Sequence, residues 1–329
     1  DYNYYDHADW LDAYISYRGE TPASVGIPAR EPYSLTPPAS DTPRINGPAV
    51  YGATPGKPFL YKIPCTGKKP MTYHVEKLPA GLRLDPVTGI ISGKTPARGE
   101  YNVNFVVKND LGEDSKEFRI ITGKGLALTP PLGWNSWNCW GLSVDDAKVR
   151  AAADSFISSG LADHGWTYIN IDDGWEAAER TESGELLSNE KFPDMNALSD
   201  YIHGKGLKLG IYSSPGPLTC GGYLGSYGYE KQDADTWAKW GIDYVKYDWC
   251  SYGKIALNDS LPELQKPYVL MQEHIVNAGR DIVYSLCQYG MGDVWKWGKD
   301  VGGNLWRTTG DITDTWESMA GIGFDQDKC

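Results

Sequence analysis

Beyond about residue 125, short apolar runs alternate along the chain with longer stretches in which apolar residues recur at helical spacing. Two of the helical stretches are 144–161, where Ser143 and Asp146 are expected to form a capping box, and 267–278. The alternation predicts βα units whose strands are parallel. The six predicted strands are 132–137, 168–175, 207–214, 244–250, 282–288 and 304–311.

Before residue 125 the pattern is different, because short β-rich runs follow one another without helical stretches. Gly, Pro and Asn-Asp turns separate these runs at about the spacing of a β-sandwich. Residues 1–43 are rich in Tyr and Pro, which predicts an extended linker with the remnant of an upstream module. We therefore expect three parts, with boundaries at 1–43, 44–124 and 125–329. The predicted strands of the second part are 59–63, 72–75, 89–92, 101–107 and 118–121.

Two α/β architectures could hold six parallel strands. A doubly wound dinucleotide-binding sheet loses support because no glycine-rich fingerprint follows the first predicted strand. Polar residues follow nearly every strand, which is typical of a (β/α)8 TIM barrel whose site is built from many strand ends. A closed barrel takes about 250 residues, whereas 125–329 supplies 205. We therefore expect a barrel that is incomplete after its sixth strand, with a six-unit open sheet as the less favoured alternative.

The charge of the chain narrows the choice of partners. Its 329 residues include 31 Lys and Arg against 43 Asp and Glu, which gives a net charge of −12. Nucleic acids and anionic membrane surfaces both require a basic face, so neither is expected as a partner. The sequence also lacks an apolar run long enough for a transmembrane helix.

Aromatic residues, cysteines and histidines give weaker indications. The 13 Trp and 22 Tyr outnumber the 6 Phe, which indicates rings that face a polar ligand, although ordinary packing with surface Tyr explains the excess equally well. The 6 cysteines form no Cys-x-x-Cys pair, and the 5 histidines lack ligand spacing, so neither a metal ion nor a cofactor is expected. One or two disulfides, as in an exported enzyme, remain open.

Chemistry-bearing side chains gather at the ends of the six strands beyond residue 125. Because these ends meet at one mouth of a barrel, we expect carboxylates, a Lys, an Arg and aromatic rings to share one pocket. Such a set suits a sugar, since charged groups can satisfy several hydroxyls and a ring can cover an apolar face. Two well-placed carboxylates suffice for glycoside hydrolysis. In chain order the residues are Trp134, Trp137, Asp172, Asp173, Tyr212, Lys246, Asp248, Cys287, Gln288, Tyr289, Arg307 and Asp311.

Taken together, these six ordered motifs resemble glycoside hydrolase family 27, the α-galactosidase (melibiase) family, over roughly residues 126–325. The run 78–93 resembles the immunoglobulin-like module found beside bacterial glycosidases. The resemblance implies a catalytic TIM barrel preceded by a small β-sandwich. It also implies a retaining exo-glycosidase that removes terminal α-D-galactosyl residues from oligo- or polysaccharides, in an exported protein that is periplasmic, cell-surface or extracellular.

The resemblance also implies roles for individual residues. Asp248 looks like the nucleophile and Asp311 like the acid/base. Lys246 lies two positions from Asp248 on the same strand face, and its charge is expected to keep the Asp248 pKa low. The implied sugar-binding residues are Trp137 beneath the ring, Tyr212 beside it, Asp172 and Asp173 at the 4- and 6-hydroxyls, Lys246 at the 3- and 4-hydroxyls, and Arg307 at the 2- and 3-hydroxyls. The implied disulfide joins Cys220 and Cys250.

Two departures from the family pattern leave alternatives open. Gly174 stands where the family often has Cys, so Cys139 is expected to be a free thiol, and Trp134 is expected in the core. Gln288 stands where many α-galactosidases carry a Glu that reads the 2-hydroxyl, and an amide can still hydrogen-bond there. The alternatives are an α-N-acetylgalactosaminidase, a β-L-arabinopyranosidase, an isomalto-dextranase or a non-catalytic carbohydrate-binding protein.

Overall fold

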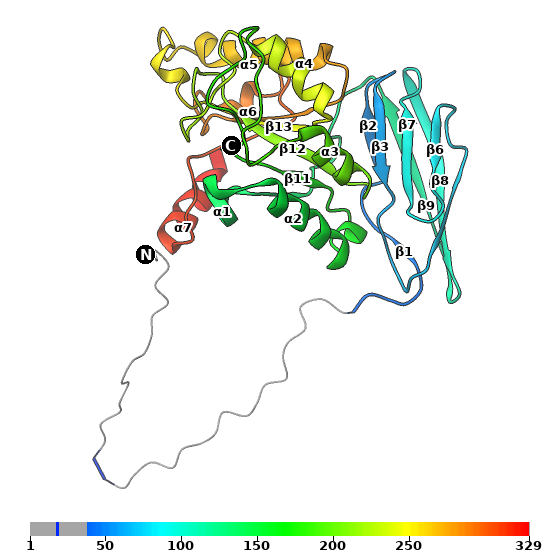
Figure 1. Cartoon of the computed structure of the whole chain (residues 1–329). Coiled ribbons are helices and arrows are strands. Elements are labelled where there is room, and N and C mark those ends of the chain that lie inside the picture. Colours follow the sequence, from blue (N-terminus) through cyan, green and yellow to red (C-terminus); the bar gives the residue numbers. More distant parts are fainter. Residues whose placement is uncertain (1–17, 20–37, 329) are drawn as a thin grey trace. The chain divides into compact units, whose positions relative to one another are not determined.

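A computed structural model describes residues 18–19 and 38–328 of the chain (Figure 1). The predicted upstream remnant and most of the predicted linker lie outside the described residues, as does Cys329. The described chain forms two units, Ser40–Gly310 and a C-terminal unit that contains Asp311–Lys328. The positions of the two units relative to one another are not determined.

The N-terminal part of Ser40–Gly310 is all β. Along β8, Val103, Phe105 and Val107 are buried in alternation with exposed or half-buried residues, as the two-residue period of a strand requires. The Phe105 and Phe118 rings stack with centroids 4.5 Å apart in the core. A four-stranded sheet has the order β2-β9-β8-β5, a three-stranded sheet has the order β3-β7-β6, and β1 pairs with β4. The strands are β1 (Arg44–Ile45), β2 (Val50–Ala53), β3 (Pro58–Lys62), β4 (Cys65–Thr66), β5 (Thr72–Glu76), β6 (Leu82–Leu84), β7 (Ile90–Lys94), β8 (Gly99–Asn109) and β9 (Gly112–Thr122).

A curled parallel sheet of six strands follows in chain order, β10-β11-β12-β13-β14-β15 (Figure 1). Strands that add one after another without a change of direction build a barrel wall, whereas a doubly wound sheet reverses its strand order. The parallel βα prediction is therefore confirmed. The strands are β10 (Gly133–Asn135), β11 (Tyr168–Asn170), β12 (Lys208–Ser213), β13 (Tyr244–Asp248), β14 (Val283–Cys287) and β15 (Leu305–Trp306).

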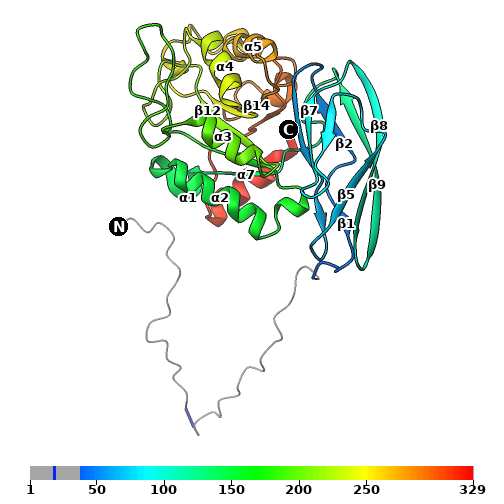
Figure 2. The same ribbon diagram turned by 45° about the vertical axis from the view of Figure 1, so that its right-hand side comes forward.

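Helices α2 to α5 follow one another around these strands (Figure 2). The helices of this part are α1 (Trp137–Trp140), η1 (Gly141–Ser143), α2 (Asp146–Ser158), η2 (Ala162–His164), α3 (Met195–His203), α4 (Glu230–Trp240), η3 (Tyr252–Lys254), α5 (Leu261–Asn277) and α6 (Val294–Trp297). The C-terminal unit holds α7 (Trp316–Phe324) and η4 (Asp325–Lys328). None of the helices in the described part of the chain has the length and apolar character needed to cross a membrane.

The predicted capping box at the start of α2 is wrong. Asp145 is the N-cap, and its side chain accepts a hydrogen bond from the Lys148 backbone N–H at 2.9 Å. Ser143 belongs to η1 instead, and its hydroxyl donates to the Trp140 carbonyl. A second difference concerns α5, which begins at Leu261, six residues before the predicted start, and contains Pro267 in its interior.

Both faces of the parallel sheet are covered. Every residue of β12 and β14 is buried, as expected for parallel strands covered on both faces, and the polar Lys208, Ser213 and Ser285 are buried with the apolar residues. Ile211, Val245 and Leu286 from neighbouring strands are fully buried in one core cluster. A sheet packed in this way holds the side chains at its strand ends in fixed places.

The β-sandwich contacts the end of the sheet where the strands begin. The Thr54 backbone N–H donates to Asp281 at 2.8 Å, and the Lys57 ammonium donates to the Arg280 carbonyl at 3.1 Å. The Lys208 ammonium, on the first residue of β12, donates to the Tyr51 hydroxyl. The opposite ends of the strands, which carry the predicted site, are therefore not occupied by these contacts.

Candidate active site

One ammonium group joins two carboxylates at the carboxyl ends of β11 and β13, on either side of β12. Lys246 and Asp248 lie two residues apart on β13 and point to the same face, so Lys246 Nζ is 3.8 Å from Asp248 Oδ2. The same Nζ is 2.8 Å from Asp172 Oδ2, just beyond β11. Burial lowers the Lys246 pKa, but Asp172, Cys287 and Asp248 together outweigh it, so the net pKa is raised and the ammonium stays charged.

Hydrogen bonds with residues before and after it in the sequence hold Asp172 in place. The Asn135 amide donates to Asp172 Oδ2 at 2.8 Å, and the Asp172 backbone N–H donates to the Ser136 hydroxyl at 2.9 Å. The Asp173 backbone N–H donates to Asp172 Oδ1 at 2.9 Å. These contacts from β10 and the β11 end fix the carboxylate with only 2% of the residue exposed.

Asp173 has a different environment from its neighbour. Its Oδ2 accepts a hydrogen bond from the Gly221 backbone N–H, whereas its Oδ1 is buried and has no hydrogen-bond partner among the described residues. Burial raises the Asp173 pKa, and the charge of Asp172 adds to this rise. A buried oxygen without a partner is the kind of group that a ligand hydroxyl can satisfy.

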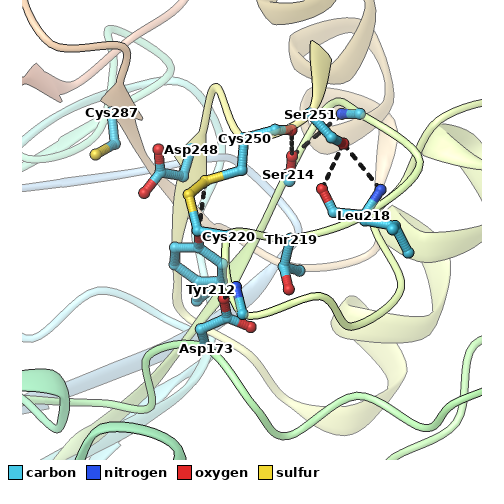
Figure 3. The surroundings of a disulfide bond; sticks show 12 residues. Asp173, Tyr212, Ser214, Leu218, Thr219, Cys220, Asp248, Cys250, Ser251 and Cys287 are labelled. Atoms are coloured by element: carbon cyan, nitrogen blue, oxygen red, sulfur yellow. Dashed lines mark hydrogen bonds between the residues drawn. A yellow bond between two sulfur atoms is a disulfide. The ribbon is translucent and has the colours of Figure 1, made fainter. Parts of the chain in front are cut away.

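The disulfide between Cys220 and Cys250, with Cα atoms 5.0 Å apart, is present as predicted (Figure 3). It joins the loop after β12 to the residue two positions after Asp248, and the Asp248 carboxylate and both sulfurs lie within 4.8 Å of one another. Ser214 reinforces the link, since its hydroxyl donates to the Cys250 carbonyl. Cys139 is an exposed free thiol, as expected.

The prediction that Lys246 keeps the Asp248 pKa low is wrong. Asp248 is 5% exposed, and burial raises its pKa above the ordinary value, while a hydrogen bond from Tyr289 and the charge of Lys246 only oppose that rise. The Cys287 thiol also faces Asp248 (Figure 3), and burial raises its pKa to about 12, so it is a neutral neighbour. Asp248 is thus a desolvated carboxylate whose ionised form is stabilised by Tyr289 and Lys246 and, to a smaller extent, by side-chain hydrogen bonds from Cys287 and Tyr212.

Tyr289 was expected in the pocket, but the sequence did not assign it a role. Its hydroxyl donates a hydrogen bond to Asp248 Oδ1, and the Arg307 guanidinium carbon lies 5.6 Å from the centroid of its ring. The signal for it was its place directly after Gln288 at the end of a strand, but that place alone gave it no role.

Gln288 uses only one end of its side-chain amide within the described part of the chain, and its sugar-binding role stays a prediction. It is 1% exposed, its amide nitrogen donates to the Met291 carbonyl at 3.0 Å, and its Oε1 has no hydrogen-bond partner in the described part of the chain. Arg307 contacts a residue beside Asp248, since its guanidinium donates to the Cys287 sulfur at 3.4 Å. The Tyr212 ring centroid lies 4.8 Å from Lys246 Nζ.

The two tryptophans of the first motif belong to different elements. Trp134 lies on β10 and packs partly buried against the core, with its ring centroid 5.4 Å from that of Trp140. Trp137 begins α1 and is 42% exposed, because its backbone N–H bonds to Asn135 and the strand ends there. The predicted strand 132–137 was therefore too long, although the core position of Trp134 is confirmed.

The structure thus brings together Asp172, Lys246, Asp248 and Tyr212, with Arg307 reaching them through Cys287. Asp311 begins the C-terminal unit, so its pairing with Asp248 stays a prediction. A charged cluster of this kind can bind a polyhydroxylated ring, and its desolvated carboxylate can attack an electrophilic carbon.

Comparisons with known proteins agree with this arrangement. A family model described as "Alpha galactosidase A" matches residues 129–326. The chain belongs to this alpha-galactosidase family. A second model, described as "Putative Ig domain", matches residues 42–123.

Relatives of this family member include an alpha-galactosidase of Coffea arabica, 46% identical over 65% of this chain and 55% of the relative. Alpha-galactosidase A of Cellvibrio japonicus is 50% identical over 58% of this chain and 46% of the relative. A solved structure from Bacteroides fragilis, described as a "putative alpha-galactosidase", has a TM-score of 0.82 and 44% identity over 86% of this chain and 60% of that one. This family member spans about half the length of the curated relatives that it matches.

Proposed function

We propose that this protein is a retaining exo-glycosidase that hydrolyses terminal α-D-galactosyl residues by double displacement. The observation that carries the proposal is the desolvated Asp248 carboxylate beside Lys246, whose ammonium also binds Asp172. Membership of the alpha-galactosidase family supports the same activity. The proposal assigns 44–124 to a non-catalytic sandwich and 125–329 to the catalytic barrel. It also includes export and a galactose-containing oligo- or polysaccharide as the substrate.

In the proposed reaction, ionised Asp248 attacks the anomeric carbon while protonated Asp311 gives its proton to the leaving oxygen. The product of this step is an ester between Asp248 and the sugar. Asp311, now ionised, removes a proton from water, and the water oxygen displaces the Asp248 carboxylate. Two inversions at the same carbon leave the released sugar with its original α configuration.

The proposed sugar contacts follow from the cluster. The unpartnered Oδ1 of Asp173 and the fixed carboxylate of Asp172 accept hydrogen bonds from the 4- and 6-hydroxyls. Lys246 donates to the 3- and 4-hydroxyls, and Arg307 to the 2- and 3-hydroxyls. Trp137, with 42% of the residue exposed, has a ring surface available to stack on the sugar, with Tyr212 beside it.

The contacts of Gln288 favour a second candidate within the same family. Its amide nitrogen is bound to the Met291 carbonyl, so only its uncharged Oε1 is left to accept a hydrogen bond from the substrate's 2-position, where a Glu would offer a charged carboxylate. A different group at that position, as in an α-N-acetylgalactosaminide, is then the second candidate. A panel of nitrophenyl glycosides separates the two, since release from the α-galactoside alone supports the first and release from the other sugar alone supports the second.

Two variants test the roles of the carboxylates. Asp248→Gly is expected to hydrolyse nitrophenyl α-galactoside at least about a thousandfold more slowly. Added azide should restore nitrophenol release by forming the β-galactosyl azide, because azide takes the place of the missing nucleophile. Asp311→Gly is expected to lose activity on substrates with a poor leaving group and to keep more on nitrophenyl substrates, which need little protonation.

The matched control is Asp259→Gly, which removes an exposed carboxylate and should leave every rate unchanged. The proposed mechanism would be wrong if azide gave no product with Asp248→Gly, or if the parent chain released β-galactose first from an α-galactoside. A chain that binds galactose but hydrolyses none of the glycosides would support the carbohydrate-binding alternative instead.

A further inference from the structure

Tyr289 occupies an unusual place at the end of β14. Its backbone has φ of 65°, in the left-handed region that a bulky aromatic residue rarely adopts outside sites where the surroundings enforce it. The next residue, Gly290, has φ of 87°, and a Cβ there would overlap the Thr308 carbonyl oxygen. The turn that contains Tyr289 therefore lies directly against the backbone that follows β15.

This turn places the Tyr289 hydroxyl beside one oxygen of the Asp248 carboxylate. That hydroxyl donates to Asp248 Oδ1, and it lies 3.6 Å from the Cys250 sulfur and 3.8 Å from the Cys220 sulfur. The other oxygen, Oδ2, is the one that faces Lys246 Nζ at 3.8 Å. The two oxygens of the carboxylate thus have different partners on different strands.

We propose that Tyr289 is a positioning residue for Asp248, one that holds Oδ1 against the disulfide so that Oδ2 is the oxygen that attacks the sugar. This inference rests on the proposed function of Asp248 as the nucleophile. A bond to Oδ1 stops rotation of the carboxylate, and a misplaced attacking atom slows such a step steeply. The hydroxyl also stabilises the ionised form that the attack requires.

Four further groups face Asp248 besides this hydroxyl. Lys246 is the cation beside the carboxylate, on the same strand, and it is also shared with Asp172. Tyr212 and Cys287 come from the two neighbouring strands, and burial raises the pKa of both, so they remain neutral. Their side-chain hydrogen bonds also lower the Asp248 pKa, but less than Tyr289 and Lys246 do. Tyr268, from α5, is a further buried neutral phenol, and the charge of Asp248 adds to the rise of its pKa that burial causes. Removal of the Tyr289 hydroxyl therefore leaves Lys246 as the main group that opposes protonation of Asp248.

The test compares the full chain with its Tyr289→Phe variant in the hydrolysis of nitrophenyl α-galactoside across pH. The variant keeps the ring and loses the hydroxyl. We expect kcat to fall about 10-fold to 100-fold with little change in KM, and the acid limb of the kcat/KM profile to move upward by about one pH unit. Tyr227→Phe, which alters an exposed tyrosine of the loop after β12, should change neither quantity.

A role confined to packing would lower stability or overall rate but would leave the acid limb in place. An unmoved acid limb in Tyr289→Phe, together with an inactive Asp248→Asn, would overturn the positioning role and leave the proposed function standing. An inactive parent chain would instead count against the proposed function alone.

A second measurement does not depend on turnover. The infrared band of the Asp248 carboxyl group is titrated in the parent chain and in Tyr289→Phe, with Asp248→Asn as the subtracted reference. A midpoint that moves upward in Tyr289→Phe supports the positioning role, and an identical midpoint in the two proteins overturns it. Circular dichroism of each variant shows whether it is folded.

Discussion

The Arg280 guanidinium makes two hydrogen bonds to the Asp243 carboxylate, from Nε at 3.0 Å and from Nη2 at 2.6 Å. His203 Nε2 lies 2.7 Å from the same carboxylate, which is 4% exposed and directly precedes β13. Burial alone would raise the Asp243 pKa, but Arg280 and His203 outweigh it and hold the pKa well below its usual range. This ion pair therefore ties β13 to the start of β14 at the end of the sheet that the sandwich contacts.

Asp243→Asn is expected to lower the free energy of unfolding by about 3 kcal/mol, because it leaves the Arg280 guanidinium largely buried without its counter-charge. A carboxyl with a depressed folded-state pKa contributes stability above its unfolded pKa, near 3.9, and loses it as the pH falls toward the folded value. The gap between parent and variant should thus be full near neutral pH and shrink below about pH 4. Urea unfolding of the parent chain and the variant from about pH 2.5 to 7 measures this difference in stability.

Asp235→Asn serves as the control for that experiment. Asp235 pairs with Lys231 on the surface of α4, and its side chain is 43% exposed, so its loss should have little effect on stability. A gap for Asp243→Asn that is as large at the lowest pH as at neutral pH would contradict the prediction.

Lys246→Met should abolish most hydrolysis and also destabilise the fold. The variant leaves two buried carboxylates, Asp172 and Asp248, without their shared cation, which should cost about 1–3 kcal/mol. Because Lys246 opposes the rise of the Asp248 pKa, its removal should raise that pKa further and move the acid limb of any residual activity to higher pH. The pH dependence of kcat/KM and urea unfolding provide the two readouts.

The matched substitution is Lys296→Met, which breaks an exposed pair with Asp293 on α6. It should leave the activity and its pH dependence unchanged. If Lys246→Met behaved in the same way, the Lys246 ammonium would have no part in the candidate site.

Removal of the disulfide should affect both stability and hydrolysis. The pair Cys220→Ser and Cys250→Ser, made together, opens a link that spans 30 residues of sequence and should lower stability by about 2–4 kcal/mol. Hydrolysis should also fall, because the released loop carries Gly221, whose N–H holds Asp173. Thermal unfolding of the double variant measures the loss of stability, and its initial rates measure the loss of hydrolysis.

Cys139→Ser is the control for the disulfide variants, since Cys139 is exposed and free. It should resemble the parent chain in both measurements. A double variant with normal rates after the loop is released would show that Asp173 does not depend on the crosslink.

Gly210 on β12 has no room for a side chain. A Cβ at this position would overlap the side-chain amide of Asn170 and would lie 3.0 Å from the Tyr244 Cβ on the next strand. Gly210→Ala is therefore expected to cost about 1–3 kcal/mol through overpacking. Gly279→Ala, where a Cβ meets no atom within 4 Å, is the control and should be close to neutral in the same urea experiment.

The features that the sequence predicts well are those with a strong local signal. The strands of the parallel sheet are rich in apolar residues and are followed by polar ones, and both faces of β12 and β14 are covered, so that all their residues are buried. Lys246 and Asp248 are placed correctly because the two-residue period of a strand fixes their relative direction. Strand ends were less well predicted, since β15 spans only Leu305–Trp306 within the eight residues expected.

Features that depend on distant parts of the chain were missed. Tyr289 reaches Asp248 only because Gly290 packs against the backbone at Thr308, a contact that no local pattern encodes. The Asp248 pKa was misjudged because burial, which depends on the whole barrel, outweighs the neighbouring charge of Lys246. The cap of α2 was misplaced by two residues because Ser143 and Asp145 are both good N-caps, and η1 decides between them.

The sandwich holds the sheet through Tyr51, Thr54 and Lys57, all at the ends where strands start, whereas every residue proposed for chemistry in this unit lies at or beyond the opposite ends. Substitutions that remodel this β-rich module should therefore change the melting temperature of the protein but not the sugar that it selects. The module can therefore acquire new binding surfaces without a change at the end of the sheet that carries the candidate site.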